Sequence, residues 1–303
     1  MPVAKPLAGL KVADFSMVYA GPICARMLSD CGASVTKIEP LGLGDTVRGN
    51  ARVFAHFNAG KSSVQIDLDS TEGQELAHRL IDEADVVIEN FAAGVIERLG
   101  LGYEAVSAAR PDIIMVASSG TGHSGPHKDY VAYGSLLQHY TGWNSISGYP
   151  EREPVTGGLG ADPWVGMELA MVTAAALNNR ALTGQGQYVD FSMAEALNAS
   201  IPEALLDYQM NGRVKEPMGN RDDWYAPHGV YHCSGADRWV AIAVTNDEEW
   251  VALCQVIGRP ELASDPRYAE AAGRRDHQDP LDAAITEWTL QHEDVNAMQL
   301  LQQ

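Results

Sequence analysis

The first 120 residues alternate between short apolar runs and amphipathic stretches. Runs such as VVI and IIMV are apolar at successive positions, which is typical of parallel strands buried on both faces. The amphipathic stretches between them predict helices. We expect strands at 10–16, 34–40, 63–68, 85–91 and 112–120, and helices at 23–32, 70–84 and 94–100. This alternation predicts an α/β fold with a doubly wound, mostly parallel sheet, which forms a Rossmann-like large domain.

The remainder of the chain predicts further helices and a second domain. Helical patterns cover 133–142, 163–182 and 192–211, and a hairpin at 229–245 precedes helices at 247–257 and 280–290. We therefore expect a large α/β domain at 1–211, a Gly- and Pro-containing linker at 212–225 and a smaller α+β domain at 226–303. The last residues lie inside an amphipathic pattern without a Gly or Pro terminator, so we expect the sequence to be incomplete.

Composition restricts the class of protein. With 46% hydrophobic and 20% charged residues, the chain is typical of a soluble globular protein. No apolar run approaches the length of a membrane span, and the N-terminus lacks the apolar core of a secretory signal. The four cysteines are scattered without CxxC spacing, which predicts reduced thiols in a cytoplasmic protein and no metal site.

The charge of the chain argues against nucleic acid as a partner. A formal net charge of −19 is unfavourable near phosphate backbones, which reward a basic face. Small anions are not excluded, because five of the basic residues in the first third of the chain predict a local positive patch. These residues are Lys37, Arg48, Arg52, Lys61 and Arg98.

Common nucleotide and catalytic motifs are missing or lack their context. Residues 55–62 satisfy a relaxed P-loop pattern, but a strand follows the match where a P-loop requires a helix. No GxGxxG follows the first strand, and neither GxSxG nor HExxH occurs, so the sequence predicts no nicotinamide or flavin cofactor. We interpret His123 and His127 as exposed or structural residues.

Asp162 lies between the glycine-rich turn GGLG and a long apolar helical pattern. With Pro163 as the first helical residue, Asp162 is a favoured N-cap, because its carboxylate accepts hydrogen bonds from unpaired amides. The apolar helix, however, places its start at the edge of a core, where a carboxylate is desolvated and reactive. Both interpretations, a structural cap and a nucleophile, remain open from the residues alone.

At this point the sequence resembles the family III CoA-transferases. The resemblance rests on LxGLKVADFSMVYAGPICARMLSDCGASVTKIEP, GD at 44–45, FNAGKSSVQIDL, ADVVIENFAAGVIERLGLGYEAV, SSGTGHSGP and GLGADPWVGMELAMVTAAALNNRALTGQGQYVDFSMAEAL, with VAIAVTNDEEWVALCQVIGRPELASDPRY in the small domain. It runs from about residue 7 to the end of the chain. Family members normally continue with a segment that returns to the large domain, so the resemblance also leads us to expect that the sequence is incomplete.

The resemblance implies an enzyme that moves CoA from an acyl-CoA to a free carboxylic acid through a covalent intermediate on Asp162. It implies oxyanion contacts from the amides of Gly157, Gly158 and Gly160. It also implies an interlocked homodimer, with neither a nucleic acid nor a membrane as partner. The CoA contacts that it implies fall on Val18, Ala20, Lys61, Asn90, Phe91, Arg98 and Tyr133.

Two departures from the family pattern bear on the reaction. Segment 219–227 holds one glycine, whereas some family members use a glycine-rich lid there. Tyr133-Gly134 stands where related racemases carry a His-Asp pair, which favours transfer over proton exchange. The alternatives are an acyl-CoA racemase or isomerase of the same fold and a non-catalytic CoA-binding subunit.

Overall fold

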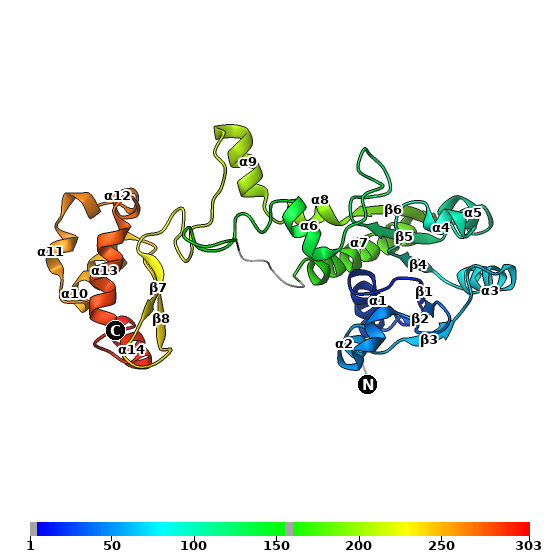
Figure 1. Ribbon diagram of the computed structural model, residues 1–303, viewed down its shortest axis with the longest axis horizontal. Coiled ribbons are helices and arrows are strands. Elements are labelled where there is room, and N and C mark those ends of the chain that lie inside the picture. Colours follow the sequence, from blue (N-terminus) through cyan, green and yellow to red (C-terminus); the bar gives the residue numbers. More distant parts are fainter. Residues whose placement is uncertain (1–4, 155–159) are drawn as a thin grey trace. The chain divides into compact units, whose positions relative to one another are not determined.

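The computed structural model describes residues 5–154 and 160–303 (Figure 1). The chain divides into two compact units. The first comprises the described residues of Met1–Ser145 and Val155–Lys215, and the second comprises Ile146–Pro154 and Glu216–Gln303. The predicted domains, 1–211 and 226–303, assign residues 146–154 and the linker differently.

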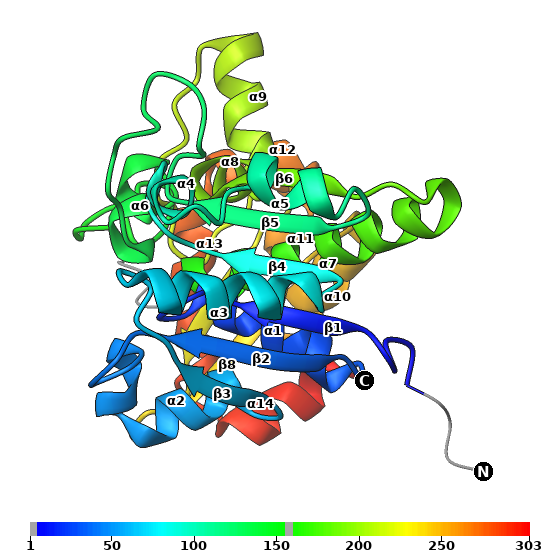
Figure 2. The same cartoon turned by 90° about the vertical axis from the view of Figure 1, so that its right-hand side faces the viewer.

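A sheet of six parallel strands forms the centre of the first unit, in the order β3-β2-β1-β4-β5-β6. Figure 2 shows these strands one above another, from β6 at the top to β3 at the bottom. The order reverses between β1 and β4, as in doubly wound folds, so the predicted fold class is confirmed. The strands are β1 (Lys11–Asp14), β2 (Ser34–Glu39), β3 (Ser62–Gln65), β4 (Val86–Glu89), β5 (Ile114–Ser119) and β6 (Gln187–Ser192).

Helices cover both faces of the sheet. Successive residues of a strand point to opposite faces, so Val86 and Ile88 belong to one core and Val87 to the other. The first core packs against α1 (Ala20–Asp30), α6 (Gly134–Tyr140), α7 (Ala161–Thr183) and α8 (Met193–Ala199). The second packs against α3 (Thr71–Asp82), α4 (Val95–Arg98) and α5 (Tyr103–Ala109). The short η1 (Thr46–Gly49) and α2 (Ala51–Asn58) connect β2 to β3.

Two details of the helices differ from the sequence prediction. Residues 192–211 form two helices, α8 and α9 (Pro202–Asn211), and not one. Pro202 lacks an N–H and disfavours a helical residue before it, so it ends α8 and opens α9 as its first residue. The helices α2 and α5 were not predicted. Ser70 is the N-cap of α3, because its hydroxyl accepts a hydrogen bond from the Gly73 amide at 3.1 Å.

The second unit contains the predicted hairpin, formed by antiparallel β7 (His228–His232) and β8 (Trp239–Ala243). Its remaining elements are α10 (Asp247–Val256), α11 (Pro260–Ala263), η2 (Pro266–Tyr268), α12 (Ala271–Asp276), α13 (Gln278–Thr289) and α14 (Asp294–Leu301). Trp250 and Tyr268 fill its core. Within the described residues, no helix combines the length and apolar character needed to cross a bilayer.

Candidate active site

A cleft of about 400 Å³ opens in the first unit where β1, β4 and β5 end. Ligands of open α/β sheets bind at this edge, beside the point where the strand order reverses. Its lining residues are Met17–Ala20, Asn90–Ala93, Ser118–Gly120, Lys128, Tyr130–Ser135, Asp162 and Met193. The cleft therefore brings together chain segments that are up to 176 positions apart, from Met17 to Met193.

Asp162 is the second residue of α7, which begins at Ala161 with Gly160 as its N-cap. The predicted N-cap role of Asp162 is therefore wrong, and its carboxylate lines the cleft. Burial raises the pKa of Asp162 to about 6, against a smaller lowering by a hydrogen bond from its own backbone amide. Asp162 is thus a partly desolvated acid at the wall of a cleft, which is the environment expected of a functional carboxylate.

Gly134 leaves the space that the Asp162 carboxylate occupies. A methyl group on the Gly134 Cα would lie 2.1 Å from Oδ2 of Asp162 and 2.8 Å from its Cγ. Any larger residue at position 134 must displace the carboxylate. Because Gly134 is the first residue of α6, the start of that helix fixes one side of the Asp162 site.

Close packing of α7 on α1 sets the position of Asp162 relative to the β1–α1 turn. A methyl group on Gly166 would lie 2.7 Å from Cβ of Ile23 and 2.8 Å from the carbonyl oxygen of Ala20. The absence of a side chain at Gly166 allows the two helix backbones to approach each other. As a result, Ala20 and Asp162, at the beginnings of the two helices, line the same cleft.

Val18, a predicted CoA contact, lines the cleft in an unusual backbone conformation. Its φ is +69°, in the left-handed region that costs an L-residue about 1–2 kcal/mol. For a β-branched residue this is a genuine outlier, and such outliers gather at functional sites. Its amide donates to both carboxylate oxygens of Asp45, at 3.2 and 3.1 Å.

Asn90 and Phe91, at the end of β4, also line the cleft. The Asn90 side chain exchanges two hydrogen bonds with the backbone of Met17, accepting at 2.7 Å and donating at 2.8 Å. Its polar atoms therefore hold the β1–α1 turn in place. Phe91 is partly buried, and its amide donates to Oε2 of Glu89 at 2.7 Å.

Ala20 and Tyr133 complete the set of predicted CoA contacts that the structure brings to the cleft. Ala20 is buried at the start of α1, and Tyr133 is 71% exposed immediately before α6. Together with Val18, Asn90 and Phe91 they form a wall that is mostly apolar.

Lys61 is placed away from the cleft. Its ammonium group contacts Asp14 Oδ2 at 2.8 Å, the Pro22 carbonyl at 2.9 Å and Asn58 Oδ1 at 2.9 Å. These bonds use all three hydrogens of a lysine, and the side chain is only 1% exposed. Burial lowers the pKa of Lys61, although Asp14 opposes that effect. In this arrangement Lys61 joins β1, α1 and α2 and has no hydrogen left for a phosphate.

The other predicted contacts lie outside the cleft or outside the described residues. Arg98 is exposed at the end of α4 and does not line the cleft. Gly160 caps α7 but is not among the lining residues. Gly157 and Gly158 lie outside the residues that the structure describes.

Two serines at the end of β5 were missed by the sequence analysis. Ser118 and Ser119 line the cleft and are 1% and 8% exposed. Within 5–154 and 160–303, neither hydroxyl has a hydrogen-bond partner. Buried polar groups are normally paired, so these hydroxyls are available to a ligand. Their position at the carboxyl end of a predicted parallel strand is the signal by which the sequence could have identified them.

A buried acid cluster lies beside this edge of the sheet. Burial raises the pKa of Glu89 to about 8, with the Phe91 amide lowering it and Glu97 and Asp190 raising it. Oε1 of Glu89 lies 3.5 Å from Nε2 of His123, whose Nδ1 lies 3.1 Å from Asp190. His123 is therefore a structural residue, joining the loop after β5 to β6. Among the described residues, no three His, Cys, Asp or Glu side chains are grouped as metal ligands.

Comparisons with known proteins agree with this geometry. The family model described as CoA-transferase family III matches residues 7–303. The succinyl-CoA–D-citramalate CoA-transferase of Chloroflexus aurantiacus is 36% identical over 301 residues, covering 95% of this chain and 74% of the relative. The acetyl-CoA:oxalate CoA-transferase of Acetobacter aceti is 35% identical over 289 residues, covering 92% and 74%.

A solved structure shows the same fold. The crystal structure of a CAIB/BAIF family protein from Brucella suis is 33% identical and superimposes with a TM-score of 0.88, covering 99% of this chain and 82% of that chain. The family match extends over almost the whole chain, and the relatives exceed 30% identity over most of their length. The chain therefore belongs to CoA-transferase family III.

Proposed function

We propose that this protein transfers CoA from an acyl-CoA donor to a free carboxylic acid, with Asp162 as the nucleophile. The observation that carries the proposal is a partly desolvated carboxylate at the start of α7, lining a cleft in a member of this family. The relatives named above act on succinyl-CoA with D-citramalate and on acetyl-CoA with oxalate. Both acids carry two carboxyl groups, so we propose a dicarboxylic acid as a substrate of this protein too.

The reaction proceeds by exchange of acyl groups on Asp162. A carboxylate oxygen of Asp162 attacks the thioester carbonyl carbon, the C–S bond breaks, and a mixed anhydride and the CoA thiolate form. The thiolate then attacks Cγ of Asp162, which releases the donor acid and leaves an aspartyl-CoA thioester. The acceptor carboxylate repeats the two steps in reverse, giving the new acyl-CoA and free Asp162. No net proton and no electron is consumed, and each step is an acyl transfer of similar energy.

The environment of Asp162 suits this role. With a pKa of about 6, the carboxylate is mostly ionised at pH 7 and therefore able to attack. The same burial that raises its pKa reduces its hydration, so less water must be removed when the thioester approaches. Lys128 is the only cationic side chain among the residues that line the described cleft.

For CoA we propose contacts with five residues of the cleft wall. Their apolar surfaces and backbone suit the pantetheine arm, and exposed Arg98 suits a phosphate beyond the cleft. We keep the amides of Gly157, Gly158 and Gly160 as candidates for stabilising the oxyanion. The five wall residues are Val18, Ala20, Asn90, Phe91 and Tyr133.

We further propose that the protein is a cytoplasmic homodimer. Trp164, Met167 and Met171 of α7 are 39%, 47% and 67% exposed, and α9 contains no buried residue. Exposed apolar surface of this kind marks interaction sites. The four free cysteines, three of them buried, fit a reducing compartment.

Trapping of the covalent intermediate tests the proposal. The protein is incubated with an acyl-CoA and hydroxylamine, digested and analysed by mass spectrometry. We expect a hydroxamate at residue 162, because hydroxylamine intercepts the aspartyl anhydride or thioester. The variant Asp162→Ala should lose both the adduct and transfer while keeping its fold. Transfer at the wild-type rate in that variant would overturn the assignment.

A second measurement separates transfer from the racemase alternative. A chiral 2-methylacyl-CoA is incubated in deuterated water without an acceptor acid. We expect no deuterium at the α-carbon, and uptake there would favour the racemase. A protein that binds acyl-CoA but gives neither the hydroxamate nor deuterium uptake would be a non-catalytic subunit.

A further inference from the structure

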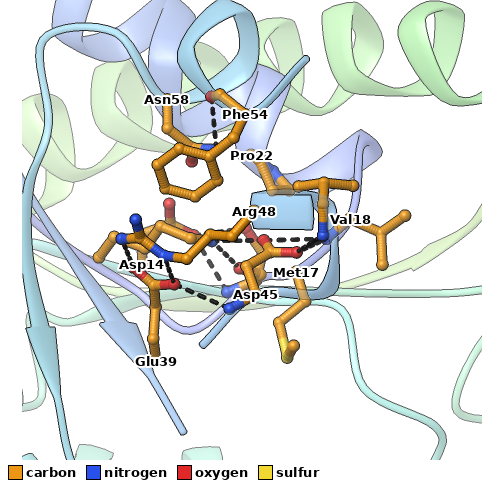
Figure 3. A network of polar contacts seen from close by, with 12 residues as sticks. Asp14, Met17, Val18, Pro22, Glu39, Asp45, Arg48, Phe54 and Asn58 are labelled. Carbon is orange, nitrogen blue, oxygen red and sulfur yellow. Dashed lines mark hydrogen bonds and ion pairs between the residues drawn. The ribbon is translucent and has the colours of Figure 1, made fainter. Parts of the chain in front are cut away.

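Side chains from three different strands or loops hold the backbone of the turn after β1. The three consecutive amides of Ser16–Val18 each donate to a side-chain oxygen. The acceptors are Asp14 at 3.0 Å, Asn90 at 2.7 Å, and Asp45 at 3.2 and 3.1 Å. Figure 3 shows Asp45 beside Val18, with dashed lines running from the Val18 amide to the carboxylate.

Val18 is the strained residue of the turn. Its φ of +69° is accessible to glycine but unfavourable for a β-branched side chain. Such a conformation persists only where the surroundings determine it. Among the described residues, Asp45 is the one acceptor of the Val18 amide, so its carboxylate is the group positioned to hold this conformation.

Asp45 is itself firmly fixed. Its carboxylate forms an ion pair with Lys37 at 3.0 Å, and the two side chains are 0% and 1% exposed. Lys37 also donates to the Ser16 carbonyl at 2.6 Å. The ion pair therefore contacts the turn at two residues, Ser16 through Lys37 and Val18 through Asp45. The amide of Asp45 donates to Oε2 of Glu39 at 2.8 Å.

Glu39 is in turn held as an anion by its neighbours. Burial by itself raises the pKa of Glu39, but hydrogen bonds from Arg48, Ser63 and the Asp45 amide outweigh it and bring the pKa to about 2. Arg48 reaches Glu39 with two nitrogens, at 2.7 and 2.6 Å (Figure 3). The segment that carries Asp45 is therefore anchored to the end of β2.

We propose that Asp45 is a positioning residue for the acyl-CoA: it holds Val18 in the left-handed conformation and thereby fixes the Met17–Ala20 wall of the cleft. The proposal rests on the proposed function, because the ligand is the acyl-CoA of that reaction. Asp45 is not itself among the residues that line the cleft, so it acts through Val18. Asp162 lies on a different element, α7, and its attack does not depend directly on this turn. Loss of the Asp45 bond should therefore weaken acyl-CoA binding more than it slows the chemical steps.

A double-mutant cycle tests the proposal, with the wild type, Asp45→Ala, Val18→Gly and the double variant. In the wild-type background we expect Asp45→Ala to raise the KM for acyl-CoA about tenfold and to change kcat less than about twofold. In the Val18→Gly background the same substitution should raise KM less than about threefold, because glycine adopts a positive φ without assistance. An equal rise in both backgrounds, or no rise at all, overturns the proposal. A residue that only supports the fold gives no such rescue by glycine.

A second comparison needs no substitution of Asp45, whose loss leaves Lys37 buried and unpaired. Val18→Gly and Val18→Ala both remove the isopropyl group, but only glycine removes the strain. The proposal expects Val18→Gly to have the higher Tm of the two. If Val18→Ala is as stable or more stable, the left-handed conformation is not under strain and the proposal fails.

The matched control for Asp45→Ala is Asp45→Asn. This variant retains an acceptor oxygen for the Val18 amide, and its KM should stay within about twofold of the wild type.

Direct binding distinguishes failure of this proposal from failure of the proposed function. The Kd of acyl-CoA is measured by calorimetry for the same four variants, each carrying Asp162→Ala so that no turnover occurs. Coupling between positions 18 and 45 in Kd supports the positioning role, whatever the trapping experiment shows for Asp162. Absence of coupling, with the Asp162 hydroxamate present in the wild type, rejects the positioning role and leaves the transferase proposal intact.

Discussion

The Asp162 carboxylate, the proposed nucleophile, is partly buried, and its charge at neutral pH lowers the stability of the fold. Burial disfavours its charged form and raises its pKa to about 6 from an ordinary value of 3.8. Between these two values the folded protein holds a proton that the unfolded chain has already lost. The free energy of unfolding therefore falls as pH rises from about 4 through about 6. Above that range the full cost of the buried charge is present.

Replacement of Asp162 by asparagine should stabilise the protein at neutral and alkaline pH. The amide is similar in shape and fits beside Gly134 but carries no charge. At pH 8 we expect Asp162→Asn to increase the free energy of unfolding by about 2–3 kcal/mol, and at pH 4 by almost nothing. Urea unfolding at the two pH values measures the difference. A gain of equal size at both would show that charge burial is not its cause.

The rate of CoA transfer should rise with pH over the range in which the free energy of unfolding falls. Only the ionised Asp162 carboxylate attacks a thioester, so we expect kcat/KM to fall about tenfold per pH unit below a pKa of about 6. Initial rates between pH 4.5 and 8 check this. Glu39, with a pKa of about 2, does not titrate in that range and so does not contribute to the change in rate. A profile that stays level down to pH 4.5 would exclude Asp162 as a desolvated nucleophile.

At the scale of elements, the local pattern predicted the order of strands and helices but not how their ends meet. One of the two interpretations of Asp162 was an N-cap, because Pro163 follows it, yet α7 begins at Ala161. Proline is tolerated throughout the first helical turn, where amides have no intrahelical partner, so Asp-Pro alone does not define a helix start. The contact of Val18 with Asp45 spans 27 positions and that of Met17 with Asn90 spans 73. Periodicity carries no information about such pairs.

Lys61 also shows that local sequence patterns do not predict contacts between distant residues. The family resemblance implied that Lys61 contacts CoA. The direction of that side chain depends on Asp14, which lies 47 positions earlier on β1 and draws the ammonium group into the interior. The family resemblance implied the candidate nucleophile and five residues that the structure places in the cleft wall. The buried ion pairs behind that wall were not predicted.

The contact between α6 and α7 makes a specific prediction about Gly134. A methyl group there would meet Oδ2 of Asp162 at 2.1 Å, so Gly134→Ala should push the carboxylate out of position. A misplaced nucleophile loses reactivity steeply, and we expect kcat to fall at least about tenfold with little change in fold. Steady-state kinetics and circular dichroism measure both. The matched control is Gly49→Ala, where an added methyl group meets no atom within 4 Å and activity should be retained. Equal kinetics for the two variants would contradict the role of Gly134.

For the molecule as a whole, charge and apolar surface oppose each other. In the proposed homodimer, the net charge of −19 on each chain would oppose association, whereas the exposed apolar side chains of α7 and α9 would favour it. The sequence pattern of α7 is apolar almost all round, yet Met167 and Met171 are exposed in the single chain. A helix that is apolar almost all round needs a partner on its outer side as well as its inner side.

Self-association through α7 should therefore be strengthened by salt and weakened by a single charge on its exposed side. Salt screens the repulsion between two acidic chains, and apolar contact is not reduced by it, so the dimer Kd should decrease as ionic strength rises. Met167→Lys should raise that Kd at least about tenfold, because it forces an ammonium group into an apolar interface. Leu76→Lys on α3 is the matched control, since Leu76 is 48% exposed against 47% for Met167 but lies in a helix on the other face of the sheet. Sedimentation velocity at low and high salt measures all three proteins. If both lysine variants shift the equilibrium equally, added charge alone is responsible, and α7 does not form the interface.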